Sequence, residues 1–264
     1  MIRAGYLQFA PEFGDMKANF AKMSALIKAH PTDLLVLPEL AATGYEFKDP
    51  EEVSQYAEEF GNGPMSEFLC SQATAHQMTL VAGYPEAAEG RLYNSSMLVT
   101  PAGEMFNYRK LHLFSRENEL FSPGDLPLRV VETEVGRIGM MICFDWFFPE
   151  VARTLALAGA QIIAHPSNLV LSYCQRAMYA RSVENGVFTI TANRTGTESR
   201  TGRTLTFTGA SQILDTKGNT LASSPTDTEA VGIASFDPVA ADNKFVNKHN
   251  DLLGSRRPEF YRTT

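Results

Sequence analysis

Three residues whose side chains suit nucleophilic catalysis stand at the ends of predicted strands. Glu39 follows the apolar run 34–37, Lys110 ends the strand after the turn 101–103, and Cys143 follows the glycine-punctuated strand 137–142. Layered α/β proteins often keep their functional residues at strand ends. Taken singly, each residue has an ordinary structural explanation: a solvated carboxylate, a charged strand residue and a small core residue. Together they predict one site.

These three side chains could transfer an acyl group. A thiol attacks a carbonyl carbon as the thiolate, and a nearby ammonium or helix N-terminus lowers its pKa from about 8.5. Because Pro149 is predicted to begin a helix soon after Cys143, we expect Lys110 and the helix dipole to lower the pKa of Cys143. Glu39 would take the thiol proton and return it to a leaving amine. Lys110 and the backbone N–H of Phe144 would stabilise the oxyanion.

Motifs for several other kinds of chemistry are missing from the sequence. It contains no G-x-G-x-x-G or Walker loop, no C-x-x-C pair and no G-x-S-x-G elbow. The five histidines, at positions 30, 76, 112, 165 and 249, lack the spacing of metal ligands. We therefore expect no metal site.

The composition is that of an acidic globular chain. Hydrophobic residues make up 44% of its 264 residues, and the formal net charge is −7 without a Lys/Arg run, so we expect a core and no nucleic-acid partner. Polar residues interrupt the longest uncharged stretch, 154–175, and residues 1–14 lack a signal-peptide core, so we expect no membrane segment. Three widely spaced cysteines favour a reducing compartment and thus a cytoplasmic protein.

Predicted strands and helices alternate along the chain, and the arrangement is used twice. The expected strands are 2–9, 34–37, 78–83, 137–142, 161–164 and 187–190, the helices are 15–29, 64–77, one from Pro149 and 176–185, and the hairpins are 92–111 and 210–223. This order predicts an α/β layered fold with a mixed sheet or two stacked sheets. Because no linker-like segment divides the chain, we expect one domain over residues 1–264.

The three candidate residues lie in short motifs. These are Pro-Glu-Leu at 38–40, Tyr-Arg-Lys-Leu-His-Leu-Phe at 108–114, and Cys-Phe-Asp at 143–145 followed by Pro-Glu at 149–150. In order and spacing they resemble the Glu-Lys-Cys triad of the nitrilase superfamily of carbon–nitrogen hydrolases. The segments 94–96, 122–125, 165–168 and 181–185 also resemble that family. The resemblance implies a four-layer αββα sandwich, no cofactor and a thioester acyl-enzyme at Cys143.

A second glutamate that orients the substrate is also implied by the resemblance. Its distance before the segment 122–124 assigns this role to Glu117. Glu119 is the competing assignment, and either residue could be a surface charge only.

The expected substrate pocket lies where aromatic and polar residues converge near Cys143. Its predicted residues are Tyr45, Phe144, Trp146, Asn168 and Tyr173, with Phe147 beside them. Because these walls carry few charges, we expect small neutral substrates. An acid substrate would need a cation for its carboxylate, and only Arg176 is an obvious candidate, although its place at a helix start also suits a surface residue.

The residues after the cysteine bear on the reaction. An aromatic residue and Asp follow Cys143, and Pro-Glu comes at 149–150, which resembles the amidase side of the family. We therefore predict hydrolysis of a small aliphatic amide to ammonia and a carboxylic acid. Trp146 makes the chain also resemble small archaeal nitrilases, which implies short aliphatic nitriles or dinitriles as an alternative. An ω-amidase or N-carbamoyl amino acid hydrolase is a further alternative.

Two other classes of protein stay open. A non-catalytic relative with the same fold would be expected to lose a triad residue, and none is lost. A papain-like hydrolase would pair Cys143 with His112 or His165, although both histidines also suit polar residues packed at strand ends.

Self-association is implied by the resemblance as well. Family members pair through helices that correspond to residues 147–158 and 173–185, and their C-terminal tails cross to the partner. We therefore expect a homodimer or a larger homo-oligomer, with the tail from about 240 to 264 packed on another subunit.

Overall fold

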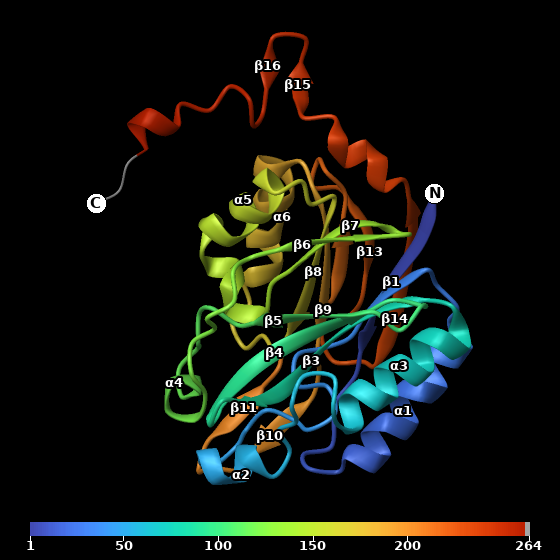
Figure 1. Ribbon diagram of the computed structural model, residues 1–264, viewed down its shortest axis with the longest axis vertical. Coiled ribbons are helices and arrows are strands. Elements are labelled where there is room, and N and C mark those ends of the chain that lie inside the picture. Colours follow the sequence, from blue (N-terminus) through green and yellow to red (C-terminus); the bar gives the residue numbers. More distant parts are fainter. Residues whose placement is uncertain (262–264) are drawn as a thin grey trace.

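The computed structural model describes residues 1–261 and contains two six-stranded β-sheets (Figure 1). Three parallel strands form the centre of the first sheet: β1 (Ile2–Gln8), β2 (Leu34–Val36) and β3 (Thr79–Ala88). Antiparallel strands flank them, namely β4 (Arg91–Val99) and β5 (Met105–Arg109) on one side and β14 (Ala230–Phe236) on the other. The central strands are mostly buried because both faces of the sheet are covered.

The second sheet repeats this plan. Its parallel centre consists of β7 (Gly136–Met140), β8 (Ile162–Ser167) and β9 (Phe188–Asn193). The antiparallel strands β12 (Gln212–Leu214) and β13 (Thr220–Ser223) follow β9, and β6 (Val130–Thr133) lies against β7. The strand order and directions therefore use one arrangement twice, as the sequence indicated.

Two helices cover the outer face of each sheet. Helices α1 (Met16–Ala29) and α3 (Pro64–His76) lie on the first sheet, and α5 (Pro149–Leu157) and α6 (Cys174–Asn185) lie on the second (Figure 1). The proline residues that begin α3 and α5 suit the first turn of a helix, where no N–H is needed. The predicted α/β four-layer αββα sandwich is confirmed.

The apolar core fills the spaces between these layers. One cluster joins the first sheet to its helices through side chains such as Leu35, Met23 and Leu69. A larger cluster begins with the inward residues of the first sheet, such as Val36, and continues through the second sheet to α5 and α6. The sheets therefore pack face to face, and their strand ends meet at a common edge.

Several elements were not predicted from the sequence. Strand β14 pairs with β1 along its whole length, a contact between distant parts of the chain that local pattern does not reveal. The remaining short elements are α2 (Pro50–Ser54), α4 (Glu117–Leu120), β10 (Thr197–Ser199), β11 (Thr204–Thr206), β15 (Phe245–Asn247), β16 (Asn250–Asp251) and the 3-10 segments Cys143–Phe147, Pro238–Asp242 and Pro258–Phe260.

After β14, the 3-10 segment Pro238–Asp242 still packs on the second sheet, and the chain then passes beyond α5 and α6 with the β15–β16 hairpin (Figure 1). The predicted partner-binding tail extends to residue 264, and its last three residues lie outside the described part of the chain. Within residues 1–261, no helix combines the length and apolar character that a membrane span requires. The expectation of one domain over residues 1–264 stays a prediction.

Candidate active site

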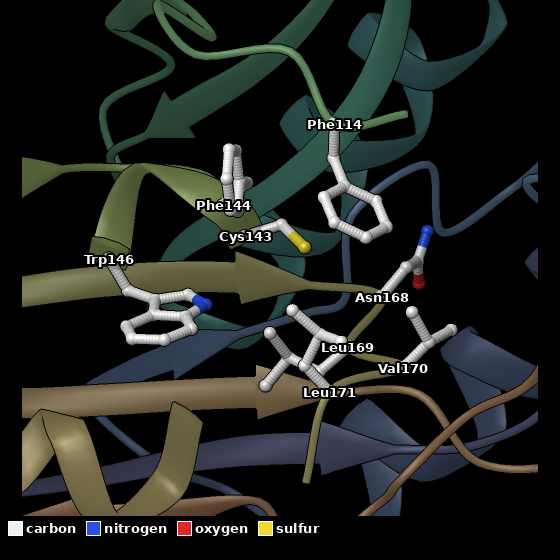
Figure 2. Close-up of a pocket in the computed structure, with 8 residues that line it drawn as sticks. All are labelled: Phe114, Cys143, Phe144, Trp146, Asn168, Leu169, Val170 and Leu171. Atoms are coloured by element: carbon white, nitrogen blue, oxygen red, sulfur yellow. The ribbon is translucent and has the colours of Figure 1, made fainter. Parts of the chain in front are cut away.

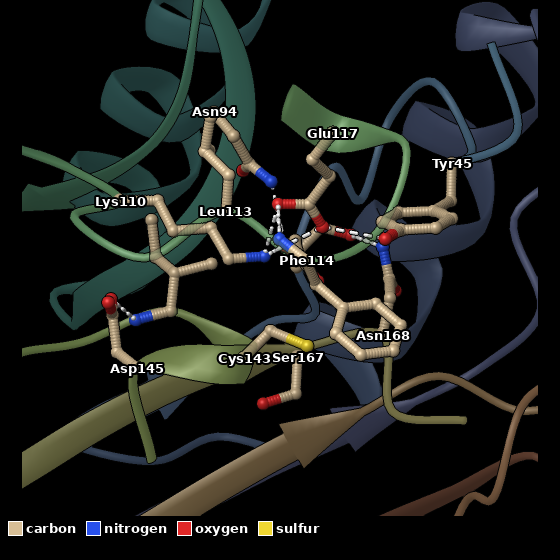
Figure 3. Close-up of polar contacts among 12 residues, drawn as sticks. Tyr45, Asn94, Lys110, Leu113, Phe114, Glu117, Cys143, Asp145, Ser167 and Asn168 are labelled. Carbon is tan, nitrogen blue, oxygen red and sulfur yellow. Dashed lines mark hydrogen bonds and ion pairs between the residues drawn. The ribbon is translucent and has the colours of Figure 1, made fainter. Parts of the chain in front are cut away.

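Strand ends and one short helix bring four of the predicted residues together. Glu39 lies shortly after β2, Lys110 directly after β5 and Cys143 shortly after β7, while Glu117 begins α4. Lys110 Nζ lies 2.6 Å from Glu39 Oε1 and 2.8 Å from the Glu117 carboxylate. The Cys143 sulfur lies close enough for all three charges to act on it (Figure 3).

Neutral donors complete this cluster. Asn94 Nδ2 donates to Glu39 Oε1 at 2.7 Å, and the Tyr45 hydroxyl donates to Glu117 Oε1 at 2.6 Å. Glu39 and Lys110 are almost fully buried. Within residues 1–261, the second carboxylate oxygen, Glu39 Oε2, is buried without a hydrogen-bond partner. That oxygen is therefore free to accept a proton.

Two glycines let the segments that carry Glu39 and Lys110 approach their neighbours closely. A Cβ at Gly83 of β3 would lie 2.5 Å from Glu39 Cα, and one at Gly124 would lie 2.2 Å from the Arg109 carbonyl oxygen. Side-chain carbons do not fit at such distances. The Gly124 N–H also donates to the Lys110 carbonyl at 2.8 Å, so the segment 122–125 braces Lys110.

Cys143 lies on a strained turn. Its φ is 40°, in the left-handed region that costs residues other than glycine about 1–2 kcal/mol. His165 Nε2 lies 2.9 Å from the Cys143 carbonyl oxygen, and it donates because a carbonyl only accepts. On the other side of the turn, the Ile142 N–H donates to Asp145 Oδ2 at 2.9 Å. These two contacts fix the backbone on both sides of the sulfur.

Asp145 accepts several hydrogen bonds although it is fully buried. Besides Ile142, the Tyr108 hydroxyl donates to it at 2.7 Å, and both the backbone N–H and the ring Nδ1 of His112 contact it, at 3.1 and 2.8 Å. The sequence indicated Asp145 only as part of a motif. Its position two residues after the cysteine is the signal that could have identified it as a positioning residue.

Burial, not the ammonium, dominates the acidity of the thiol. Burial raises the pKa of Cys143 well above its ordinary value and the Glu39 carboxylate adds to this, whereas Lys110 lowers it. The expectation that Lys110 lowers the pKa overall is therefore wrong, because desolvation outweighs the attraction of one ammonium. The helix dipole does not reverse this, since α5 begins only at Pro149 and Cys143 begins a short 3-10 segment.

Burial also affects the pKa values of Glu39 and Lys110. Burial raises the pKa of Glu39, with Lys110 opposing this and Glu117 adding to it. Burial alone would lower the pKa of Lys110, but the carboxylates of Glu117 and Glu39 outweigh it and raise that pKa. At rest, the site thus holds an ammonium between two carboxyl groups beside a protonated thiol.

A narrow cavity opens at the sulfur (Figure 2). Its lining consists of Phe114, Cys143, Phe144, Trp146, Asn168, Leu169, Val170 and Leu171. No lining residue is charged. The sequence did not single out Phe114 or residues 169–171, although these directly adjoin the motifs at 108–114 and 165–168.

The predicted pocket residues divide into two groups. Phe144, Trp146 and Asn168 line the cavity, and Asn168 Nδ2 donates to the Glu39 carbonyl at 2.9 Å. Tyr45 instead lies behind Glu117, where it makes the hydrogen bond described above. Tyr173 is 43% exposed and packs edge-on against Trp146, outside the cavity lining.

Three further candidates point away from the cavity. Phe147 is 48% exposed, and Arg176 is exposed on α6. The side chain of Glu119 is 66% exposed and pairs with Arg116, whereas Glu117 is buried against Lys110. Of the two candidate glutamates, the structure therefore brings only Glu117 to the cluster.

Neither candidate histidine contacts the sulfur through a hydrogen bond in the described chain. His165 is engaged by the Cys143 carbonyl and by Thr191, and burial lowers the pKa of His165 to about 4. His112 faces Asp145 and stacks on Phe148. Among residues 1–261, no group of three or more His, Cys, Asp and Glu side chains is arranged to hold a metal ion.

Comparisons with known proteins agree with this fold. The chain matches the carbon–nitrogen hydrolase family over residues 3–243, so it belongs to this family, the nitrilase superfamily, as its motifs indicated. It is 44% identical to a nitrilase of Pyrococcus abyssi over 99% of both chains. It is 35% identical to an (R)-stereoselective amidase of a Pseudomonas species, over 81% of this chain and 78% of the relative.

A solved structure extends the comparison to three dimensions. The crystal structure of a carbon–nitrogen hydrolase from Helicobacter pylori G27 matches with a TM-score of 0.87 and 29% identity, covering 98% of this chain and 96% of that one. The protein is therefore a carbon–nitrogen hydrolase in both sequence and fold, and both a nitrilase and an amidase are among its relatives.

Proposed function

We propose that this protein hydrolyses short, neutral aliphatic amides through a thioester at Cys143, releasing ammonia and a carboxylic acid. The observation that carries this proposal is the buried oxygen Glu39 Oε2, which has no hydrogen-bond partner among the residues that the structure describes, beside a thiol that burial keeps protonated. A protonated nucleophile needs a base, and the other Glu39 oxygen is already held by Lys110 and Asn94. The uncharged cavity supports a neutral substrate.

In the first step, Glu39 takes the proton from Cys143 Sγ while the sulfur attacks the amide carbon. A C–S bond forms, and the carbonyl π electrons move to oxygen. Two of the three N–H groups of Lys110 face carboxylates, which leaves one for the oxyanion. The backbone N–H of Phe144 would supply a second donor.

Collapse of this intermediate breaks the C–N bond. The proton on Glu39 moves to the nitrogen, which leaves as ammonia, and the acyl group stays on Cys143 as a thioester. Glu39 then accepts a proton from water as the water oxygen attacks the thioester, and the departing thiolate takes that proton back. Glu117, held by Lys110 and Tyr45, would orient the amide group.

Nitrile hydrolysis is the second candidate function, favoured by the 44% identity to a protein named nitrilase. The thiol would add to the C≡N carbon and give a thioimidate, which reaches the same thioester after addition of water and loss of ammonia. The relative named as an amidase supports the amide reaction. Substrates with a carboxylate have less support, because Arg176 does not line the cavity.

The proposal is tested by measuring ammonia release from short amides, ω-amido acids, N-carbamoyl compounds and nitriles, together with a search for an acyl adduct by intact mass. We expect kcat/KM for propionamide to exceed that for succinamate and for propionitrile. A strong preference for succinamate would contradict the neutral pocket, and a strong preference for propionitrile would favour the second candidate.

We also propose that the protein forms at least a homodimer through the face made by α5 and α6. Exposed apolar side chains gather on these helices and on the C-terminal tail: Leu157, Tyr173, Tyr179, Val183, Phe245, Val246, Phe260 and Tyr261. Such exposure is typical of surfaces that a partner covers. Light scattering at several concentrations should give a dimer mass or more, and a concentration-independent monomer mass would contradict this.

A cytoplasmic location is the remaining part of the proposal. Cys70, Cys143 and Cys174 are all free thiols, which supports a reducing compartment. Fractionation of cells that produce the protein, with detection in the cytoplasmic or the exported fraction, tests this prediction.

A further inference from the structure

Trp146 is the single tryptophan of the chain and forms one wall of the cavity beside Cys143. Its side chain is 4% exposed and packs edge-on against Phe147 and Tyr173, with ring centroids 5.0 and 5.7 Å away. These outer rings fix the plane of the indole. Figure 2 shows the indole nitrogen on the edge of the ring that faces the cavity, toward Leu169.

The indole N–H makes no hydrogen bond within residues 1–261. Arg181 Nε donates to the backbone carbonyl of Trp146 at 3.0 Å, but that contact does not involve the ring. Buried tryptophans usually find a partner for this N–H. The neighbouring walls supply apolar side chains from Phe114, Phe144, Leu169, Val170 and Leu171. Trp146 Nε1 is therefore a directed polar group in a mostly apolar cavity, and such groups orient ligands.

The chemistry of the matching group follows from the donor and its surroundings. An indole N–H only donates, so its partner must be an acceptor. No charged side chain lines the cavity, and burying a carboxylate against one neutral N–H costs more than a single hydrogen bond returns. The matching acceptor is therefore neutral: a carbonyl, carboxamide, nitrile or hydroxyl group.

We propose that Trp146 Nε1 donates a hydrogen bond to a neutral acceptor at the far end of the substrate's acyl chain. The preferred substrates are then short amides with a second neutral polar group, such as diamides. This inference rests on the proposed function, because the scissile carbonyl at Cys143 fixes which end of the substrate reaches Trp146.

Two pairs of amides with matched shape test this preference. Isovaleramide has the shape of malonamide and 4-methylpentanamide has the shape of succinamide, but each lacks the far acceptor. We expect a higher kcat/KM for each diamide, counted per reactive group. Trp146→Phe keeps an aromatic ring and removes the N–H, so it should lower kcat/KM for the diamides about 3- to 10-fold and change the alkyl amides by less than about twofold.

The control variant is Tyr56→Phe, a partly buried position outside the cavity lining, which should leave the ratio between paired substrates unchanged. Equal losses for both members of a pair in Trp146→Phe would overturn the inference and leave the proposed function intact. Ammonia release from none of the four amides by the unaltered protein would instead overturn the proposed function.

A binding measurement tests the hydrogen bond from Trp146 without turnover and without altering Trp146. In ¹⁵N-labelled Cys143→Ala protein, the single tryptophan gives a single indole N–H resonance. Malonamide should move its proton shift downfield, as a new hydrogen bond requires, and isovaleramide should not. Absence of a shift with malonamide, or the same shift with both amides, would overturn the inference even if Trp146→Phe fails to fold.

Discussion

The two sheets share one strand plan but bring different chemistry to the site. The first sheet and the loop after it carry the ionic groups Glu39, Lys110 and Glu117, which pair with one another. The second sheet carries the protonated thiol of Cys143 and most of the apolar cavity walls. Each ionic group of the first half has a partner of opposite charge, and the thiol of the second half lies beside this paired cluster.

The residues that follow the equivalent strands of the two sheets differ in charge. Glu39 follows β2 of the first sheet, and Asn168 follows β8, the strand at the same place in the second. The two residues meet, since Asn168 Nδ2 donates to the Glu39 carbonyl at 2.9 Å. The first sheet supplies the carboxylate of Glu39 at this position and the second sheet supplies the neutral amide of Asn168, which avoids a further buried charge.

Removing the nucleophile of the second half should have the largest effect. We expect Cys143→Ala to lower kcat at least about a thousandfold with little change in thermal unfolding, because a small neutral side chain replaces another. Ammonia release and circular dichroism melting measure the two quantities. Cys70→Ala is the matched control and should keep its activity, and residual turnover of Cys143→Ala near that of the unaltered protein would exclude the thioester.

Removing a charge from the first half should cause the second largest loss of activity. Glu39→Gln deletes the proposed base and should lower kcat about 100- to 10,000-fold. Because the Glu39 carboxylate raises the pKa of Cys143, the same change should move the pH midpoint of Cys143 alkylation downward. Mass spectrometry of iodoacetamide-treated protein from pH 6 to 10 follows this midpoint.

Glu119→Gln is the control for this charge removal, because its side chain is 66% exposed, and we expect less than a twofold change in kcat. Retained turnover in Glu39→Gln together with complete loss in His112→Ala would favour the Cys–His mechanism over the triad.

Loosening the strained turn of Cys143 should have a smaller effect. Asp145→Asn keeps the shape but weakens the contacts from Ile142, Tyr108 and His112, so we expect kcat to fall about 10- to 100-fold with KM nearly unchanged. A purely structural role would instead lower the unfolding temperature without this split between kcat and KM. Steady-state kinetics on protein shown to be folded at the assay temperature distinguishes the two.

The neutral imidazole of His165 in the second half should give the smallest effect. Burial lowers the pKa of His165 to about 4, so as the pH falls the unfolded chain takes up this proton before the folded one does. The free energy of unfolding should thus lose about 2 kcal/mol through His165 between pH 7 and pH 5. His165→Gln does not titrate, so its stability deficit, measured by urea unfolding, should shrink at pH 5, and an equal deficit at both pH values would contradict the neutral imidazole.

Local pattern predicted an α/β layered fold, and the motifs, through their resemblance to the nitrilase superfamily, implied the sandwich and the identity of the clustered residues. Glu39 and Cys143 could be proposed because each follows a predicted apolar strand, and Lys110 because it ends the predicted strand after the turn 101–103. The spacing of Glu117 before the segment 122–124 led to the glutamate that contacts Lys110. These inferences depend on neighbours in sequence, which is why they needed no coordinates.

The burial of side chains, the direction in which they point and the pairing of distant strands could not be predicted in this way. The acidity of Cys143 was misjudged because the sequence indicates a nearby ammonium but not the desolvation that outweighs it. Tyr173 and Phe147 were assigned to the pocket from their chain positions, yet both side chains are largely exposed, Tyr173 just before α6 and Phe147 at the end of the 3-10 segment after Cys143. Strand β14 was missed because its pairing with β1 joins opposite ends of the chain.

The raised pKa of Cys143 also has a chemical consequence outside the reaction itself. Peroxide and general electrophiles attack the thiolate much faster than the thiol, so a cysteine that keeps its proton is slow to be oxidised. In the proposed mechanism, the substrate carbonyl and Glu39 Oε2, which has no hydrogen-bond partner among residues 1–261, draw that proton away. On that mechanism, the reactivity of the sulfur would depend on bound substrate, and the thiol would resist oxidation between turnovers.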